Sequence, residues 1–275
     1  MFLPIVRRFP PLLLRGSNRF ASTGFVKTEV DDKTGIAVVS MNRPRVNSLN
    51  LDLLRDMSSA LDAVEKNKYS GMILTSSFET VFCAGLDITV MHRPEEAAFR
   101  EFWTTFQDVW VKLFNSSFPT AAAINGHAPA GGCLLAMSCE YRVMRPNFTI
   151  GLNETQVGIV SPLWVMATMN NVLPRREAEM ANTLGTMFKT EEALKIGLID
   201  EIADTREEAI AKCTKFLQLF AKVPKTARAL TKQSFRRKYF ETLDREPDFW
   251  AFFNHIRKPE IQKHLDMYME KLKKK

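Results

Sequence analysis

The sequence lacks the patterns that identify several common classes of protein. Its four cysteines form no C-x-x-C pair and have no histidines at ligand spacing, so neither a zinc site nor a disulfide framework is expected. There is no dinucleotide fingerprint, no P-loop, no metal-ligand cluster and no internal repeat. Free thiols in a reducing compartment are the simplest expectation for the cysteines.

Charge is missing from one long segment. A quarter of the chain (25%) is charged, yet no Asp, Glu, Lys or Arg lies between Lys112 and Glu140. The segment contains "PTAAAINGHAPAGGCLLAMSC", residues 119–139, with a glycine pair at Gly131 and Gly132. Prolines, glycines and polar residues would break a lipid-exposed helix, so this is not a membrane span. We expect it to be buried inside a soluble protein.

Acidic residues are also missing from the start of the chain. The first one is Glu29, whereas four arginines precede it. An Arg-rich, acid-free and Ser-containing start is typical of a mitochondrial transit peptide, which we expect over residues 1–22, with cleavage near 19–23. A secretory signal and a disordered basic tail are the competing interpretations. Removing the four arginines lowers the formal net charge from +7 to +3, so the basic pI gives little support to nucleic-acid binding.

Strands alternate with helices through the first two thirds of the chain. Alternating and β-branched residues predict strands at 35–42, 69–77, 120–128, 141–145 and 148–155. Apolar residues at helical spacing predict helices between them, at 51–67, 97–114 and 130–139. From about residue 162 the pattern is almost entirely helical. These patterns predict an α/β core followed by a helical subdomain.

The glycine pair stands where a predicted strand meets a predicted helix. The first turn of a helix has unpaired N–H groups and a positive dipole end, and glycine lets a ligand oxygen approach them closely. The motif "FCAGLD" places a second junction of this kind at Ala84-Gly85. Two N–H groups aimed at one oxygen would form an oxyanion hole. Tight packing of a buried turn is the alternative explanation for either motif alone.

One carboxylate stands out beside these motifs. Glu154 lies in "IGLNETQVGIVSP", flanked by apolar sequence on both sides. It is either the cap of a helix within Asn153-Glu154-Thr155 or a desolvated base with a raised pKa.

Four motifs occur together in the order and spacing of a known family. They are "NRPRVNSLN", "VFCAGLDI", "INGHAPAGGCLLAMSCEYR" and "IGLNETQVGIVSP". On these motifs the chain resembles the crotonase (enoyl-CoA hydratase/isomerase) superfamily from about Phe25 to its C-terminus. Within that superfamily it is most similar to the mitochondrial Δ3,Δ2-enoyl-CoA isomerases. Any one motif alone would be weak, but "AGLD", "PAGGC" and "GLNETQ" together are specific.

The resemblance implies a fold and an assembly. It implies a crotonase-like spiral of ββα units over residues 25–220, with a C-terminal helical subdomain over residues 221–275 that closes the site and assembles a homotrimer. It implies an acyl-CoA thioester substrate and no separate cofactor, because CoA is part of the substrate. It further implies the mitochondrial matrix and β-oxidation of unsaturated fatty acids, with neither a nucleic-acid partner nor a transmembrane segment.

The resemblance also assigns the site residues. The backbone N–H groups of Ala84 and Gly131 would form the oxyanion hole, and Glu154 would be the catalytic carboxylate. The residues expected to line the substrate site are Ala84, Gly85, Leu86, Asp87, Ile88, Gly131, Leu134 and Asn153. The CoA phosphates need cations, for which Arg43, Arg45 and the C-terminal lysines are candidates.

Leu134 decides which reaction of the superfamily we expect. Hydratases of this superfamily have a second glutamate three residues after the glycine of the hole, and the two carboxylates position a water. Here that residue is Leu134, so the sequence favours a shift of the double bond without water. By this hypothesis Glu154 removes a C2 proton from a 3-enoyl-CoA and returns it at C4, giving the trans-2-enoyl-CoA.

Three alternatives remain at the level of sequence. The first is another enzyme of the superfamily: a hydratase, a dienoyl-CoA isomerase or an acyl-CoA hydrolase. The second is a thiol acyltransferase that uses Cys83 or Cys133, although buried free cysteines are commonly inert. The third is an acyl-CoA-binding scaffold without activity, which would have no need of Glu154.

Overall fold

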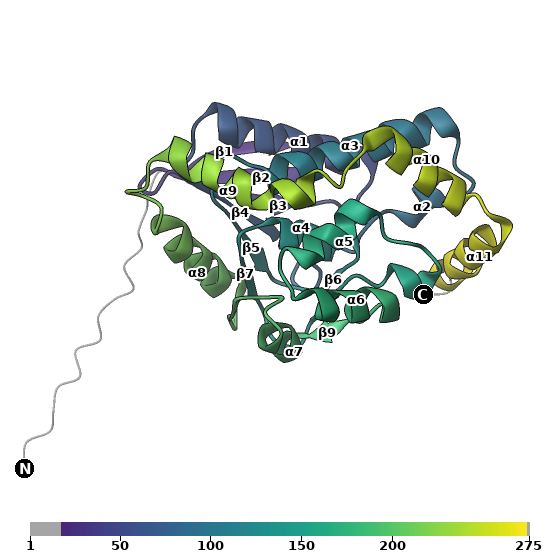
Figure 1. Ribbon diagram of the computed structural model, residues 1–275. Helices are drawn as coiled ribbons and strands as arrows, with labels where there is room; N and C mark the ends of the chain where they lie inside the picture. Colours follow the sequence, from purple (N-terminus) through teal and green to yellow (C-terminus); the bar gives the residue numbers. More distant parts are fainter. Residues whose placement is uncertain (1–17, 274–275) are drawn as a thin grey trace, which may run out of the picture.

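The computed structural model describes residues 18–273, which form an α/β core with helices on both faces of a mixed sheet (Figure 1). The sheet order is β1-β2-β3-β4-β5-β7-β10. The first three strands pair antiparallel and the others parallel. Their bounds are β1 Asn18–Thr23, β2 Val26–Asp31, β3 Ile36–Met41, β4 Gly71–Ser76, β5 Thr120–Ile124, β7 Tyr141–Met144 and β10 Glu201–Ile202.

The central strands alternate between two apolar cores. On β3, Ala37 and Val39 face the main core, whereas Ile36 packs on the opposite side of the sheet. Strands β4 and β5 are buried over their whole length, as expected for parallel strands covered on both faces.

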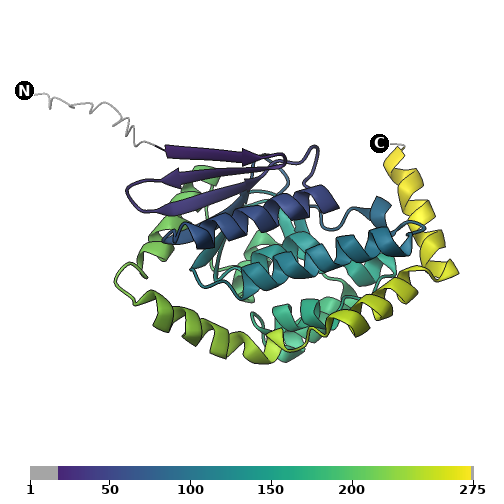
Figure 2. The ribbon, with the colours of Figure 1, turned by 90° about the horizontal axis from the view of Figure 1, so that it is seen from above.

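Helices cover both faces. α1 and α3 lie side by side over one face, which Figure 2 shows from above, and α8 packs against β4, β5 and β7 on the other. The helices before the last strand are α1 Leu51–Lys66, α2 Ile88–Met91, α3 Glu96–Phe114, α4 Gly131–Ser138, the 3₁₀ helix η1 Glu154–Val157, α5 Leu163–Asn170, α6 Arg175–Leu184 and α7 Thr190–Lys195. After it come α8 Arg206–Gln218, α9 Lys225–Phe240, α10 Arg245–Ile256 and α11 Pro259–Lys273.

A second, small sheet has the order β6-β8-β9, with bounds β6 Ala128–Pro129, β8 Thr149–Gly151 and β9 Phe188–Lys189. The strand predicted over 120–128 is therefore two strands, because the chain leaves the main sheet at Asn125. The Asn125 side-chain amide donates to the carbonyls of Ser76 and Phe78, which holds the corner. The last third is likewise not wholly helical, since β9 and β10 interrupt it.

The predicted boundaries fit the structure unequally. Most of the predicted leader, residues 1–17, lies outside the described residues. Its end does not: β1 pairs with β2 over six residue pairs from Asn18 to Thr23. A leader that ended at residue 22 would include most of this edge strand, and its boundary stays a prediction. The predicted start of the helical subdomain, residue 221, falls in the loop between α8 and α9.

Helix α9 buries a row of three cationic side chains against the core. Its buried residues are Arg228, Lys232 and Arg236, spaced one turn apart. Arg228 and Lys232 both pair with Glu140, which directly follows the segment without charge. Burial alone would raise the pKa of Glu140, but the charges of Lys232 and Arg228 outweigh it and lower that pKa. Arg236 donates to the carbonyls of Phe114 and Ser138, at 2.6 and 2.9 Å.

We predict that Glu140→Gln lowers the free energy of unfolding by about 3–5 kcal/mol, because it leaves buried Arg228 without a counter-charge and makes Lys232, whose pKa burial already lowers to about 7, give up its proton. Urea denaturation at pH 7 measures the change. The matched control is Glu179→Gln, which breaks the exposed Arg176–Glu179 pair and is expected to cost at most about 0.5 kcal/mol. Equal costs for the two variants would contradict the prediction.

Candidate active site

Two short parallel strands bring the candidate site together. β6 leads into α4 and β8 leads into η1, and they pair in parallel with Pro129 opposite Gly151. The bond from the Ala130 N–H to the Gly151 carbonyl, 2.8 Å, continues this pairing. Because paired parallel strands end at the same edge, the chain delivers Gly131 and Glu154 to the same place from segments that are well separated in sequence.

The first turn of α4 packs directly on the backbone of the Cys83–Leu86 loop. A Cβ added to Gly132 would lie 2.2 Å from the Cys83 carbonyl oxygen, which no side chain tolerates. The residue before the helix, Ala130, has a φ of 48° and a ψ of −119°. A non-glycine residue in this region costs about 1–3 kcal/mol, and such strain clusters at functional sites. The alternative role predicted for the glycine pair, tight packing, therefore applies to Gly132.

Gly131 has the other role. A Cβ added to it would lie 3.5 Å from the backbone nitrogen of Leu86, and one added to Gly85 would lie 3.2 Å from the nitrogen of Gly131. The two N–H groups are thus neighbours across a gap that only glycines leave open. Within residues 18–273 neither group donates a hydrogen bond. The Gly131 N–H is free because the first N–H groups of a helix have no intrahelical acceptor. Two free donors side by side are what an oxyanion hole requires.

The prediction that Ala84 supplies the second donor is wrong. Its N–H donates to the Val46 carbonyl, 3.1 Å away, and is not available to a ligand. The neighbouring residue that is free is Leu86, because Leu49 and Leu86 form a parallel bridge. In that bridge the Leu49 N–H donates to Gly85 and the Asp87 N–H donates to Leu49, which leaves the Leu86 N–H unused.

Glu154 is the first residue of η1, and its carboxyl group points into the protein. The residue as a whole is partly exposed, but its oxygen Oε2 is fully enclosed and has no hydrogen-bond partner within the described part of the chain. The Glu154 charge also raises the pKa of the buried Cys133. Because Cys133 follows Gly131 by two residues on α4, the carboxylate lies close to the first turn of that helix. The surface-cap alternative for Glu154 is therefore not supported.

Burial shifts the protonation of Glu154. Desolvation raises the pKa of its carboxyl group to about 7, while its own backbone N–H and the Ser161 hydroxyl lower it by a smaller amount. No charged side chain contributes to this shift among the residues that the structure describes. A carboxyl group whose pKa lies near neutral pH is suited to take a proton and to return it.

The wall beside these groups is apolar. Leu134 follows in the first turn of α4, its N–H bonded to the Ala130 carbonyl at 3.0 Å, and it is buried in the main core. All eight residues of α4 are buried. The thiol of Cys83, which lies in the same loop as Leu86, has its pKa raised to about 12 by burial, and burial also raises the pKa of Cys133 well above its usual value. Neither thiol forms the thiolate that a nucleophile needs, which argues against the acyltransferase alternative.

The other residues expected to line the site have separate positions. Asp87 caps α2 and pairs with Arg43 at 2.9 Å, so this arginine is already bound to a carboxylate. Asn153 precedes η1 without capping it. Ile88 lies on the wall of a cavity of about 290 Å³ that is lined by η1 on one side and by α11 on the other. The other residues of that wall are Thr155, Gln156, Val157, Gly158, His264, Leu265, Met267 and Tyr268.

Sequence reasoning missed two contributors. Leu86 was expected only to line the site, and Ser161 was not considered. The motif "FCAGLD" offers three successive N–H groups from Ala84 to Leu86, and only the pairing with Leu49 shows which one is free. For Ser161 the sequence carries no signal, because it reaches Glu154 through the turn after η1.

Within residues 18–273, no cluster of three His, Cys, Asp or Glu side chains could hold a metal ion. No helix in that range is long and apolar enough to cross a membrane.

Comparison with known proteins gives a consistent result. Residues 31–275 match the family model Enoyl-CoA hydratase/isomerase. The chain is 41% identical to Enoyl-CoA delta isomerase 1, mitochondrial, of Mus musculus over 94% of this chain and 91% of that protein. Its identity to the Homo sapiens protein of the same name is 39%, over 94% and 86%.

Solved structures of the same family are similar to this chain. The structure of human mitochondrial delta3-delta2-enoyl-CoA isomerase superposes with a TM-score of 0.88 at 38% identity, over 91% of this chain and 99% of that one. An enoyl-CoA hydratase from Bacillus halodurans shares the fold, with a TM-score of 0.80 at 22% identity over 89% and 100%.

The two adjacent glycines give a matched pair of variants. Gly132→Ala is expected to destabilise the protein by about 3 kcal/mol or more, because its Cβ meets a backbone carbonyl that cannot move aside. Gly131→Ala is expected to cost about 1 kcal/mol, since its nearest contact is the flexible Leu49 side chain, at 3.0 Å. Thermal and urea denaturation measure both. Similar destabilisation by the two would contradict their separate roles.

Proposed function

The chain belongs to the enoyl-CoA hydratase/isomerase family, and from this premise we propose that it is an enoyl-CoA delta isomerase. It moves the double bond of a 3-enoyl-CoA ester to give the trans-2-enoyl-CoA. The observation that carries the proposal is the enclosed carboxylate of Glu154. It lies near two free backbone donors, and within residues 18–273 no second acid contributes to its pKa shift.

The reaction uses the groups of the site in turn. The thioester oxygen accepts hydrogen bonds from the N–H groups of Leu86 and Gly131. Glu154 then removes a proton from C2, which is acidic because it lies between a thioester and a carbon–carbon double bond. The negative charge moves into the thioester oxygen of a dienolate, where each N–H donor contributes about 10²- to 10³-fold to the rate. Glu154 returns the same proton to C4.

The apolar surroundings favour this reaction over hydration. Adding water to a 2-enoyl-CoA needs a held water molecule and usually a second acid–base group. Leu134 provides neither, and a dry site protects the dienolate from side reactions. A desolvated carboxylate with a pKa of about 7 is half ionised at neutral pH, so it serves as base and then as acid within one turnover.

The place of this activity follows from its chemistry and its relatives. Double bonds at C3 arise when an unsaturated acyl chain is shortened from its thioester end, so the enzyme serves β-oxidation of unsaturated fatty acids. The curated relatives carry the word mitochondrial in their names, and the Arg-rich start of this chain agrees with that location. We propose that the enzyme acts in the mitochondrial matrix, on an acyl-CoA substrate.

We predict that Glu154→Gln lowers kcat/KM for a trans-3-enoyl-CoA by at least about 10³-fold, because the amide cannot take the C2 proton. For the unmodified chain, kcat/KM rises about tenfold per pH unit below the Glu154 pKa of about 7 and levels off above it, since only the carboxylate is a base. The assay follows the absorbance of the conjugated 2-enoyl thioester.

Two controls separate the outcomes. With a trans-2-enoyl-CoA the absorbance should stay nearly constant, and a fall would show hydration despite Leu134. The variant should fold normally and be no less stable above pH 7. A raised carboxyl pKa means that the folded state binds more protons than the unfolded state between about pH 4.5 and 7, so ionised Glu154 lowers stability as the pH rises through that window. Full activity of Glu154→Gln would overturn the mechanism.

The assembly is proposed from one surface. α9 buries Arg228, Lys232 and Arg236, and it exposes Leu230 and Phe235, the latter at 78%, on the two flanks of its solvent side. The neighbouring α5 segment exposes Val160 and Leu163, and α5 contacts α9. A row of exposed large apolar side chains marks an interface. We propose that this face joins copies of the chain into a homotrimer.

The variant Phe235→Asp is expected to shift the protein from trimer to monomer, because it places a charge in an apolar contact. Analytical ultracentrifugation at micromolar concentration measures the shift. Leu219→Asp is the matched control, since Leu219 is exposed at 70% but belongs to the end of α8 and to neither α9 nor α5. A monomeric unmodified chain would contradict the proposed assembly.

A further inference from the structure

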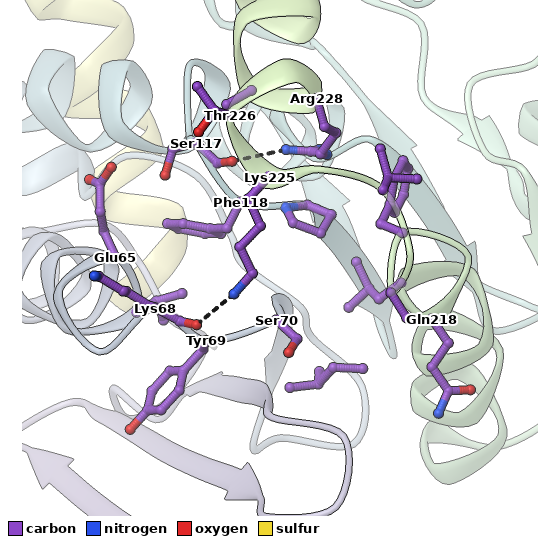
Figure 3. Close-up of a pocket in the computed structure, with 18 of the residues that line it drawn as sticks. Glu65, Lys68, Tyr69, Ser70, Ser117, Phe118, Gln218, Lys225, Thr226 and Arg228 are labelled. Carbon is purple, nitrogen blue, oxygen red and sulfur yellow. Dashed lines mark hydrogen bonds between the residues drawn. The ribbon is translucent and has the colours of Figure 1, made fainter.

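A second cavity lies far from Glu154. It has a volume of about 430 Å³ and opens between the C-terminal end of α1, the end of α8 and the start of α9 (Figure 3). This volume is within the range of sites for small organic ligands, about 300–1,000 Å³.

The sheet separates this cavity from the candidate active site. Ile36, Ser70 and Pro119 lie on its wall, and each stands at or just before the amino end of a parallel strand. The active-site loops follow the carboxyl ends of those strands. The length of α1 gives the distance between the two sites. Leu49, just before the first residue of α1, contacts the active site, and Lys68, just after the last residue of α1, borders the cavity. Sixteen residues of helix span roughly 24 Å.

The wall of the cavity is mostly apolar. The side chains that form it come from three separate parts of the chain: Val64, Phe118, Leu217, Phe220, Val223 and Leu230. Val64, Phe118 and Leu217 are buried, whereas Val223 and Leu230 are exposed at 40% and 59%. The lining therefore suits an alkyl chain.

Cations outnumber acids around this apolar wall. Lys68, Lys225 and Arg228 line the cavity, against the single carboxylate of Glu65. Figure 3 shows Lys225 reaching across to the backbone of Lys68, whose carbonyl it meets at 3.0 Å. A mostly apolar cavity with surplus positive charge attracts an amphipathic anion.

Arg228 adds a positive charge that is fixed in position. Its residue is only 9% exposed, and it donates to the Ser117 carbonyl at 3.2 Å and pairs with Glu140. Its remaining nitrogen, Nε, is buried and has no hydrogen-bond partner within the described residues. A buried N–H group without a partner is costly, but an atom enclosed to this degree does not face the cavity, so Arg228 contributes its charge to the wall and no free donor.

We propose that this cavity is a second ligand site, which binds a medium-chain fatty acid anion. The alkyl chain occupies the apolar wall, and the carboxylate lies among Arg228, Lys225 and Lys68. Glu65, together with the Glu140 carboxylate that pairs with Arg228, disfavours a ligand with several negative charges, and an uncharged lipid would leave the remaining surplus of positive charge unmatched. The site is independent of the proposed isomerase activity, because it shares no residue with Glu154 or the two backbone donors.

Calorimetric titration of the full chain with octanoate tests the proposal. It is performed with saturating octanoyl-CoA present, which has no double bond and fills the active site without reacting. Saturable binding is expected, with a Kd changed less than about twofold by the CoA ester. Octanol should bind at least about fivefold more weakly, because it lacks the charge. Displacement of octanoate by octanoyl-CoA would assign it to the active site and overturn the proposal.

Matched variants locate the bound molecule. Lys225→Glu is expected to weaken octanoate about fivefold or more, and Lys222→Glu, on an exposed neighbour outside the cavity, less than about twofold. Ala221→Trp, at an exposed lining position, should fill the cavity and abolish binding, whereas Ala97→Trp on the exposed side of α3 should not. Equal losses from the two charge reversals, or binding that survives Ala221→Trp, would overturn the proposal.

Discussion

The candidate site depends on one close contact between two stretches of backbone. The first turn of α4 can lie against the Cys83–Leu86 loop only because Gly132 has no side chain, since an added Cβ would lie 2.2 Å from the Cys83 carbonyl. That contact sets the N–H groups of Leu86 and Gly131 beside each other. The parallel pairing of β6 with β8 then brings in Glu154 from the other side. The donors are backbone groups on packed elements, so they need no rearrangement when charge develops on the ligand.

Burial without charge has several consequences at once. An enclosed carboxylate with no ionic partner has a raised pKa, and the same low-polarity surroundings keep the nearby thiols of Cys83 and Cys133 protonated. Opposite behaviour is found at Glu140, where burial is outweighed by Lys232 and Arg228 and the pKa is lowered. One carboxylate is therefore prepared for proton transfer and the other for holding helices together, although both lie next to α4.

Much of this arrangement could be predicted from the sequence, and the failures have physical reasons. The α/β core with its helical C-terminal part, and the family, are confirmed. The motifs of Gly131 and Glu154 are local, so the sequence alone predicts both residues as members of the site. Ala84 was wrong because the free N–H group is decided by the bridge between Leu49 and Leu86, a contact between distant segments. The pairing of β1 with β2 could not be predicted for a similar reason, since an Arg-containing edge strand is revealed only by its contact with another strand.

α4 is fixed at both ends, and the second attachment links the site to the outer surface. Gly132 anchors its first turn, while at its last turn the Ser138 carbonyl accepts from Arg236 and Glu140 follows directly. All of the cations involved belong to the inner side of α9, whose outer side carries Leu230 and Phe235. The ion pairs hold the buried side of α9, whereas Leu230 and Phe235 leave apolar surface on its exposed side that a partner contact would cover. A contact that covers the outer face thus also steadies the cations that hold α4, and with it one of the two donors of the oxyanion hole.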